Sequence, residues 1–158
     1  MKGKKVRAED YARRLFKLID ITKLPIDITP ILKHYNIEVK EESFTGILGV
    51  SFKSKNVNLI VLNKNLPSTQ KLFTLAHEIG HIVMPHKGSP NICLIGQNKL
   101  MEQSANRFAA ELLMPQPTLK RLWEEYKSNP EHRIRILAEL FGVSYEALST
   151  RVKILGLR

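Results

Sequence analysis

The sequence is short of cysteine, of long hydrophobic runs and of acidic residues. Its 158 residues include one cysteine, Cys93, which cannot form an internal disulfide, so a disulfide-stabilised miniprotein is excluded and a cytoplasmic protein is expected. The apolar stretches at 57–62 and 79–84 are far shorter than the roughly 18–20 residues that span a bilayer, so no membrane partner is expected. The basic start at 1–7 is not followed by the apolar segment of a secretory signal.

Acidic side chains are outnumbered, with 15 Asp and Glu against 25 Lys and Arg, which gives a formal net charge of +10. The excess is spread along the chain, as +4 in residues 1–20, +3 in 21–117 and +3 in 118–158. A diffuse excess favours an acidic partner or only solubility, and direct nucleic-acid binding is the less favoured alternative. The length fits a single domain, 1–158, in which 117–158 form a C-terminal helical portion.

The first half of the chain combines short helices with strands. Residues 8–19 are predicted to form a helix, and a second begins after Thr29, with Pro30 at its first position. Three short segments rich in β-branched residues are predicted as strands: 37–40, 46–52 and 57–62. The last two form a β-hairpin around the polar turn 53–56.

The second half has the apolar periodicity of helices. Ser68 or Thr69 can cap a helix that ends before Pro85, and 86–97 is predicted as a loop. The remaining predicted helices cover 100–113, 119–126, 134–141 and 145–155. Strands followed by packed helices predict an α+β fold with a small antiparallel sheet and a mainly helical C-terminal half.

Two histidines four residues apart, His77 and His81, lie inside the helix that follows Ser68. Positions i and i+4 lie roughly 40° apart around a helix, so both imidazoles leave one face and can share a metal ion. Glu78 projects to the side, within reach of a water molecule in the ion's open position, and can take its proton. Two histidines and a carboxylate suit zinc, with manganese as the alternative.

A catalytic zinc usually has three protein ligands, so a third is needed. His86 is disfavoured because no glycine turns the chain between it and His81, and Glu111 lies about 180° around its helix from Glu102. Glu102 is therefore the predicted third ligand, and Asn106, one turn further on, can steady a ligand histidine.

Two blocks of sequence, Phe73–His81 and Glu102–Pro115, closely resemble the ImmA/IrrE family of metallopeptidases, and the resemblance extends over residues 8–157. The family implies a zincin-like metallopeptidase core whose metal ligands would be three of the residues above: His77, His81 and Glu102. Glu78 would be the catalytic base. Because several members cleave a helix-turn-helix repressor, the resemblance implies a zinc endopeptidase of the short anti-repressor type.

Other catalytic features are less sharply predicted. The segment Val57–Leu62 is the expected edge strand for an extended substrate, and Gly80 would allow a substrate or strand to approach closely. A second group that stabilises the oxyanion is normally useful, but the spacing does not choose among His86, Tyr126 and His132.

The C-terminal segment has the spacing of a helix-turn-helix, with Ser144 capping a helix that carries Arg151 and Lys153. A helical hairpin that packs on the core is favoured over a DNA-reading element, and this surface could also dock a repressor. Two rivals to a peptidase stay open: a non-catalytic zincin-fold module that binds a repressor or DNA, and a DNA-binding protein with a structural metal.

Overall fold

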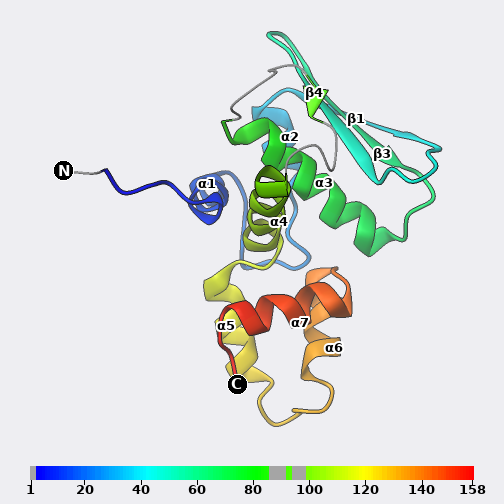
Figure 1. The fold of residues 1–158 in the computed structure, drawn as a ribbon. Helices are drawn as coiled ribbons and strands as arrows, with labels where there is room; N and C mark the ends of the chain where they lie inside the picture. Colours follow the sequence, from blue (N-terminus) through cyan, green and yellow to red (C-terminus); the bar gives the residue numbers. More distant parts are fainter. Residues whose placement is uncertain (1–2, 86–91, 94–98) are drawn as a thin grey trace.

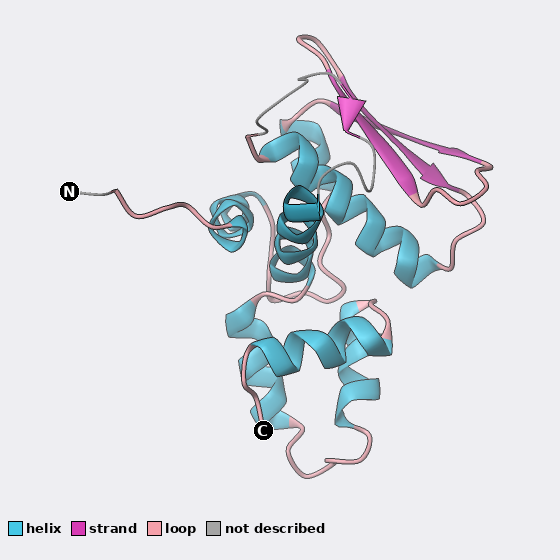
Figure 2. Ribbon diagram, in the orientation of Figure 1, coloured by secondary structure: helices cyan, strands magenta, loops and turns pink. Residues whose placement is uncertain are grey.

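The computed structural model describes residues 3–85, 92–93 and 99–158. A small sheet lies against one long helix, and further helices make up the rest of the molecule (Figures 1 and 2). The predicted α+β class is confirmed. Within the described part of the chain, no helix has both the length and the apolar character that crossing a membrane requires.

The N-terminal helices are shorter than predicted. Helix α1 covers Ala8–Arg14, and the chain then tightens into a 3-10 turn, η1, at Leu15–Leu18. Asp10 fixes the start of α1, because its carboxylate accepts a hydrogen bond from the backbone N–H of Arg7 at 2.9 Å. Helix α2, Thr29–His34, begins with a proline in its first turn, as predicted.

Among the described residues, four strands form one sheet in the order β1-β3-β2-β4. Their bounds are β1 Ile37–Glu42, β2 Gly49–Lys53, β3 Asn58–Asn63 and β4 Ile92–Cys93. The predicted hairpin is confirmed, since β2 and β3 are antiparallel.

Two expectations about this sheet were wrong. It is mixed rather than antiparallel throughout, because β1 pairs in parallel with β3. Although β2 follows β1 in the chain, the two strands are not neighbours in the sheet, because β3 lies between them. The segment Val57–Leu62 therefore belongs to a central strand, and β4 rather than β3 lies outside β2.

Helix α3, Ser68–Val83, packs against β2, β3 and helix α4, Lys99–Leu113. Neither Ser68 nor Thr69 caps α3, because the extended backbone of Pro67 places the boundary one residue earlier and Ser68 is already helical. Most of the predicted loop 86–97 lies outside the described residues, although β4 falls within it.

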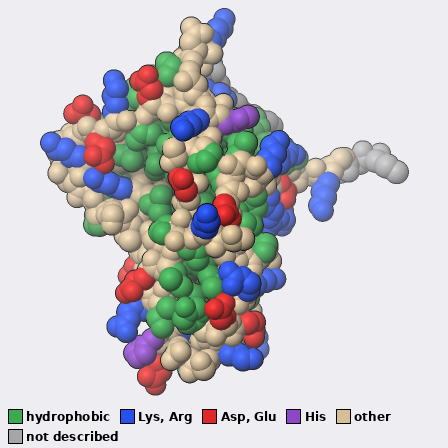
Figure 3. All heavy atoms as spheres, turned by 180° about the vertical axis from the view of Figure 1, so that it is seen from behind, with side chains coloured by type: hydrophobic (Ala, Val, Ile, Leu, Met, Phe, Trp, Pro, Cys, Tyr) green, Lys and Arg blue, Asp and Glu red, His purple; other side chains and the backbone are tan. Residues whose placement is uncertain are grey.

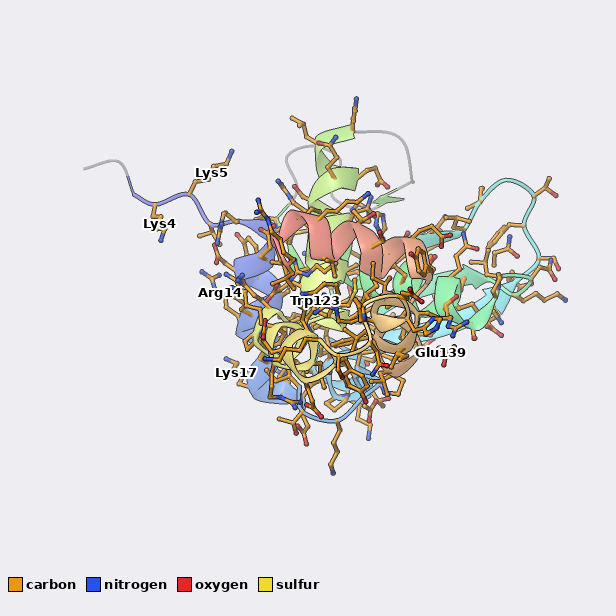
Figure 4. All side chains as sticks on the ribbon, turned by 90° about the horizontal axis from the view of Figure 1, so that it is seen from below. Lys4, Lys5, Arg14, Lys17, Trp123 and Glu139 are labelled. Carbon is orange, nitrogen blue, oxygen red and sulfur yellow. The ribbon has the colours of Figure 1, made fainter. Side chains whose placement is uncertain are left out.

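Three C-terminal helices form a separate group below α4 in Figure 1: α5 Gln116–Glu125, α6 Arg133–Phe141 and α7 Tyr145–Ile154. Gly142 ends α6 with φ at 68°, and the Ser144 hydroxyl accepts a hydrogen bond from the Ala147 N–H at 3.0 Å, the predicted cap of α7. Trp123 lies at the centre of this group (Figure 4).

Buried side chains of the α1–α4 region and of the C-terminal helices belong to one hydrophobic cluster, from Ala8 to Val152. A hydrogen bond of 2.9 Å from the Thr118 hydroxyl to the Ile21 carbonyl also joins the two parts. On the face shown in Figure 3, Lys and Arg side chains are scattered among Asp and Glu. Lys4 and Lys5 lie on the segment that projects away before α1 (Figure 4).

Candidate metal centre

The close contact of α3 with α4 brings the predicted site together. Gly80 faces the buried Phe108 of α4, and a Cβ added at Gly80 would lie 2.9 Å from Phe108 Cδ1. The space at this glycine is therefore filled by the neighbouring helix and not left for a substrate, which corrects the sequence-based expectation. Glu102 and Asn106 precede Phe108 on α4, and the same packing of the two helices brings both of them to His77 of α3.

Three predicted side chains meet between these helices. Nε2 of His77 lies 3.1 Å from Nε2 of His81 and 3.0 Å from Oε2 of Glu102. Nε2 of His81 lies 2.9 Å from Oε1 of Glu102. Both imidazoles are buried, and the carboxylate is mostly covered. The group is able to offer three ligand atoms to one ion.

Asn106, one turn beyond Glu102, contacts the outer nitrogen of His77. Its Oδ1 lies 2.8 Å from His77 Nδ1, and an amide oxygen can only accept a hydrogen bond. In the neutral imidazole Nδ1 then carries the proton, and the lone pair of Nε2 is directed toward His81 and Glu102. This is the tautomer that metal binding requires.

The separations suit a small divalent cation. Ligand atoms about 2.0–2.2 Å from a tetrahedral ion lie about 3.3–3.6 Å from one another. The three observed separations, 2.9–3.1 Å, are only a few tenths of an ångström shorter. Two imidazole nitrogens and one carboxylate can therefore hold such an ion with little rearrangement, and they leave a position for a non-protein ligand.

Glu78 is fully buried beside this group. Neither of its carboxylate oxygens has a partner with hydrogen-bond geometry among the described residues. Burial disfavours the ionised form and raises the pKa of Glu78 from 4.5 to about 7, with the Glu102 charge adding to the rise. A carboxylate with a pKa near 7 can both accept and release a proton at neutral pH.

Ser51 on β2 was not singled out in the sequence. It is buried in the strand next to α3. Its hydroxyl favours the ionised form of Glu78 and so lowers the pKa of that carboxyl, whereas burial raises it. The available signal was weak: a single hydroxyl between the apolar residues Val50 and Phe52 of a predicted strand.

The other predicted residues lie apart from this centre. His86 falls outside the described residues. Tyr126 ends α5 and His132 precedes α6, so both lie near the connection at the far end of the molecule from the sheet (Figure 1). Glu111 is buried on α4, where it accepts a hydrogen bond from Arg13 at 3.1 Å.

Arg151 also has a role that differs from the DNA-reading interpretation. Its guanidinium is buried, pairs with Glu111 and donates to the Met114 carbonyl. A long cation on a helix is exposed by default, so the spacing alone could not predict this contact. Because Arg151 is buried against α4, Lys153 is the basic side chain of α7 that is left to contact DNA. This weakens the DNA-reading interpretation.

Comparison with known proteins agrees with this geometry. The family described as the IrrE N-terminal-like domain, a family of metallopeptidases, matches residues 32–153. The "Uncharacterized immunity region protein 2" of Bacillus phage phi105 is 33% identical over 104 residues, which are 63% of this chain and 62% of that protein. The alignment thus spans less than two thirds of the relative. The matched residues include the whole of α3 and α4, and the chain belongs to the peptidase family of IrrE N-terminal-like domains.

Proposed function

We propose that this protein is a zinc-dependent endopeptidase that hydrolyses one peptide bond in a specific protein, a helix-turn-helix repressor. The observation that carries the proposal is the arrangement on α3 and α4. Nε2 of His77, Nε2 of His81 and the Glu102 carboxylate face one another within 3.1 Å, and the fully buried Glu78 carboxylate lies beside them.

Each side chain has a separate role in this proposal. His77, His81 and Glu102 are the metal ligands, and Asn106 holds His77 in the tautomer that presents Nε2. When bound, the zinc ion supplies a Lewis acid that polarises the scissile carbonyl and activates water. Glu78 accepts a proton from the attacking water and delivers it to the leaving amine. Burial keeps this carboxyl near the pKa that such a shuttle needs.

The substrate would lie extended along the β2–β4 side of the sheet, because β2 carries Ser51 next to Glu78. A repressor as substrate is supported by the relative from Bacillus phage phi105, whose name places it in an immunity region.

The test uses zinc-loaded protein and the helix-turn-helix regulator encoded nearest to its gene, with Glu78→Gln in parallel. Mass spectrometry should find one defined cut with the parent protein and none with Glu78→Gln, although both bind one zinc ion per chain. Cutting that survives Glu78→Gln would reject the assigned base.

The alternative is a regulatory module that keeps the fold and sequesters a repressor without hydrolysis. In that case the regulator would bind uncut, and Glu78→Gln would leave relief of repression in cells unchanged.

A further inference from the structure

A groove separates the first half of α3 from α7, with α4 as its floor. It has a volume of about 650 Å³, within the range of binding pockets. We propose that this α3–α7 groove docks an amphipathic helix of the protein substrate, apolar along one side and basic at one end. The proposal rests on the proposed peptidase function and names a second contact between enzyme and substrate.

The apolar part of the groove is made by side chains from all three helices: Phe73 of α3, Ala110 of α4, and Ala147 and Ile154 of α7. Ile154 is 65% exposed, although it lies on the last turn of α7 beside this apolar floor. A helix laid between α3 and α7 would cover it, as amphipathic helices do in helix-binding grooves.

A negative charge on α7, the Glu146 carboxylate, indicates the charge that the partner helix should carry. Glu146, Thr150 and Ile154 follow one another at intervals of four residues, and all three line the groove. No described residue forms an ion pair with Glu146, so a carboxylate stands free at one end of the row and an isoleucine at the other. Arg107 and Arg151 also line the groove, but Arg107 lies 3.9 Å from the Glu9 carboxylate and Arg151 is paired with Glu111, so their charges are already offset. A basic side chain at one end of the partner helix would supply the opposite charge that Glu146 lacks among the described residues.

The groove also reaches the metal centre. Asn106 lines it and at the same time contacts His77 Nδ1 at 2.8 Å. A helix docked over Asn106 would exclude water from this hydrogen bond and strengthen it. Substrate docking would thus hold His77 in its metal-binding orientation, and short peptides that lack the docking helix would be cut slowly.

The test measures docking without cleavage, in the Glu78→Gln protein, with the nearest-encoded helix-turn-helix regulator as the probe. Ile154→Asp in this background should weaken binding of the regulator at least tenfold by calorimetry, and Glu146→Lys should weaken it as well. Tyr145→Asp is the matched control: Tyr145 is also an exposed apolar residue of α7, at 54%, but it does not line the groove. It should leave the affinity unchanged. In the cleaving protein, Ile154→Asp should raise KM and leave kcat within twofold.

Equal affinity of Ile154→Asp and Tyr145→Asp, or no complex at all, would overturn the docking site. So would an effect of Ile154→Asp on dimerisation measured by sedimentation, because the groove would then hold a second copy of the chain. Selective loss of binding in Ile154→Asp, together with no cleavage by the parent protein, would retain the docking site and reject the peptidase.

Discussion

At the scale of single residues, the candidate centre depends on how the ligand side chains are held. Asn106 is exposed on α4, yet its amide oxygen fixes the ring of His77. Such outer contacts typically contribute 10–100-fold to metal affinity. We expect Asn106→Ala to weaken zinc binding by a factor in this range, measured by competition with a chromophoric chelator.

Asn106→Asp, which keeps an acceptor oxygen at the same place, should recover most of that affinity. Gln103→Ala, at an exposed position of the same helix, serves as the control and should bind zinc like the parent. If Asn106→Ala and Gln103→Ala bind equally well, the amide does not position His77.

Glu78 gives the metal-free protein a specific dependence on pH. Its pKa is raised in the folded state from 4.5 to about 7, so the folded chain holds this proton more tightly than the unfolded chain. The resulting stabilisation is fully present below about pH 4.5 and is lost as the pH rises through 7. The difference amounts to about 3 kcal/mol in the free energy of unfolding.

Urea unfolding at pH 5 and pH 8 measures the free energy of unfolding of the metal-free parent and of metal-free Glu78→Gln, whose side chain does not titrate. The stability of Glu78→Gln relative to the parent should be higher at pH 8 than at pH 5. The same relative stability at both pH values would mean that burial does not shift this carboxyl.

At the scale of elements, the two central helices can approach closely because Gly80 has no side chain. Alanine at this position would bring a methyl group to within 2.9 Å of the Phe108 ring, which is fully buried and cannot move freely. Overpacking of this kind costs about 1–3 kcal/mol. We expect Gly80→Ala to lower the free energy of unfolding by that amount in denaturant titrations.

A second substitution identifies the cause. Phe108→Ala removes Cδ1 and Cγ, the two atoms that lie closest to the added methyl group, so Gly80→Ala and Phe108→Ala together should cost less than the sum of the two single changes. Strict additivity would show that Gly80 is required for another reason.

The helices were predictable from the sequence because each one carries its own signals. The stripe of α3, the proline in the first turn of α2 and the Ser144 cap are local features. The sheet order was not predictable in this way. In addition to β2, β3 pairs with β1, and the residues paired in that contact are 21 positions apart in the chain. No local sequence signal indicates whether β3 makes this second pairing.

The geometry of the centre was predictable for a similar reason. Histidines four apart on one helix must share a face, and a glutamate on the next helix had one suitable position. Contacts that need tertiary packing were not: the close approach of Phe108 to Gly80, the hydroxyl of Ser51 beside Glu78 and the burial of Arg151.

At the scale of the whole molecule, a buried ion network joins the C-terminal helices to α4. Glu111 is fully buried between Arg151 of α7 and Arg13 of α1. Arg151→Met would leave the carboxylate with the half-exposed Arg13 and the Gln116 backbone N–H, which donates to it at 3.4 Å, and we expect a loss of about 3 kcal/mol in the free energy of unfolding. Chemical denaturation checks this, with the exposed Lys153→Met of the same helix as control.

The double variant Arg151→Met with Glu111→Leu removes both buried charges. It should be more stable than Arg151→Met alone, because no uncompensated charge stays inside. A double variant that is less stable than either single variant would show that the network contributes more than its desolvation costs.

The division of the proposed ligands between two helices ties folding to the supply of metal. His77 and His81 come from α3 and Glu102 from α4, so the three atoms meet only in the packed chain. An ion that binds there is a cross-link available to the folded state alone, and each tenfold excess of free zinc over its Kd adds about 1.4 kcal/mol of stability. The melting temperature should therefore climb with zinc concentration and fall on chelation, but stay level in His81→Ala. In a zinc-starved cell, proteolysis would then remove this protein faster than in a replete one.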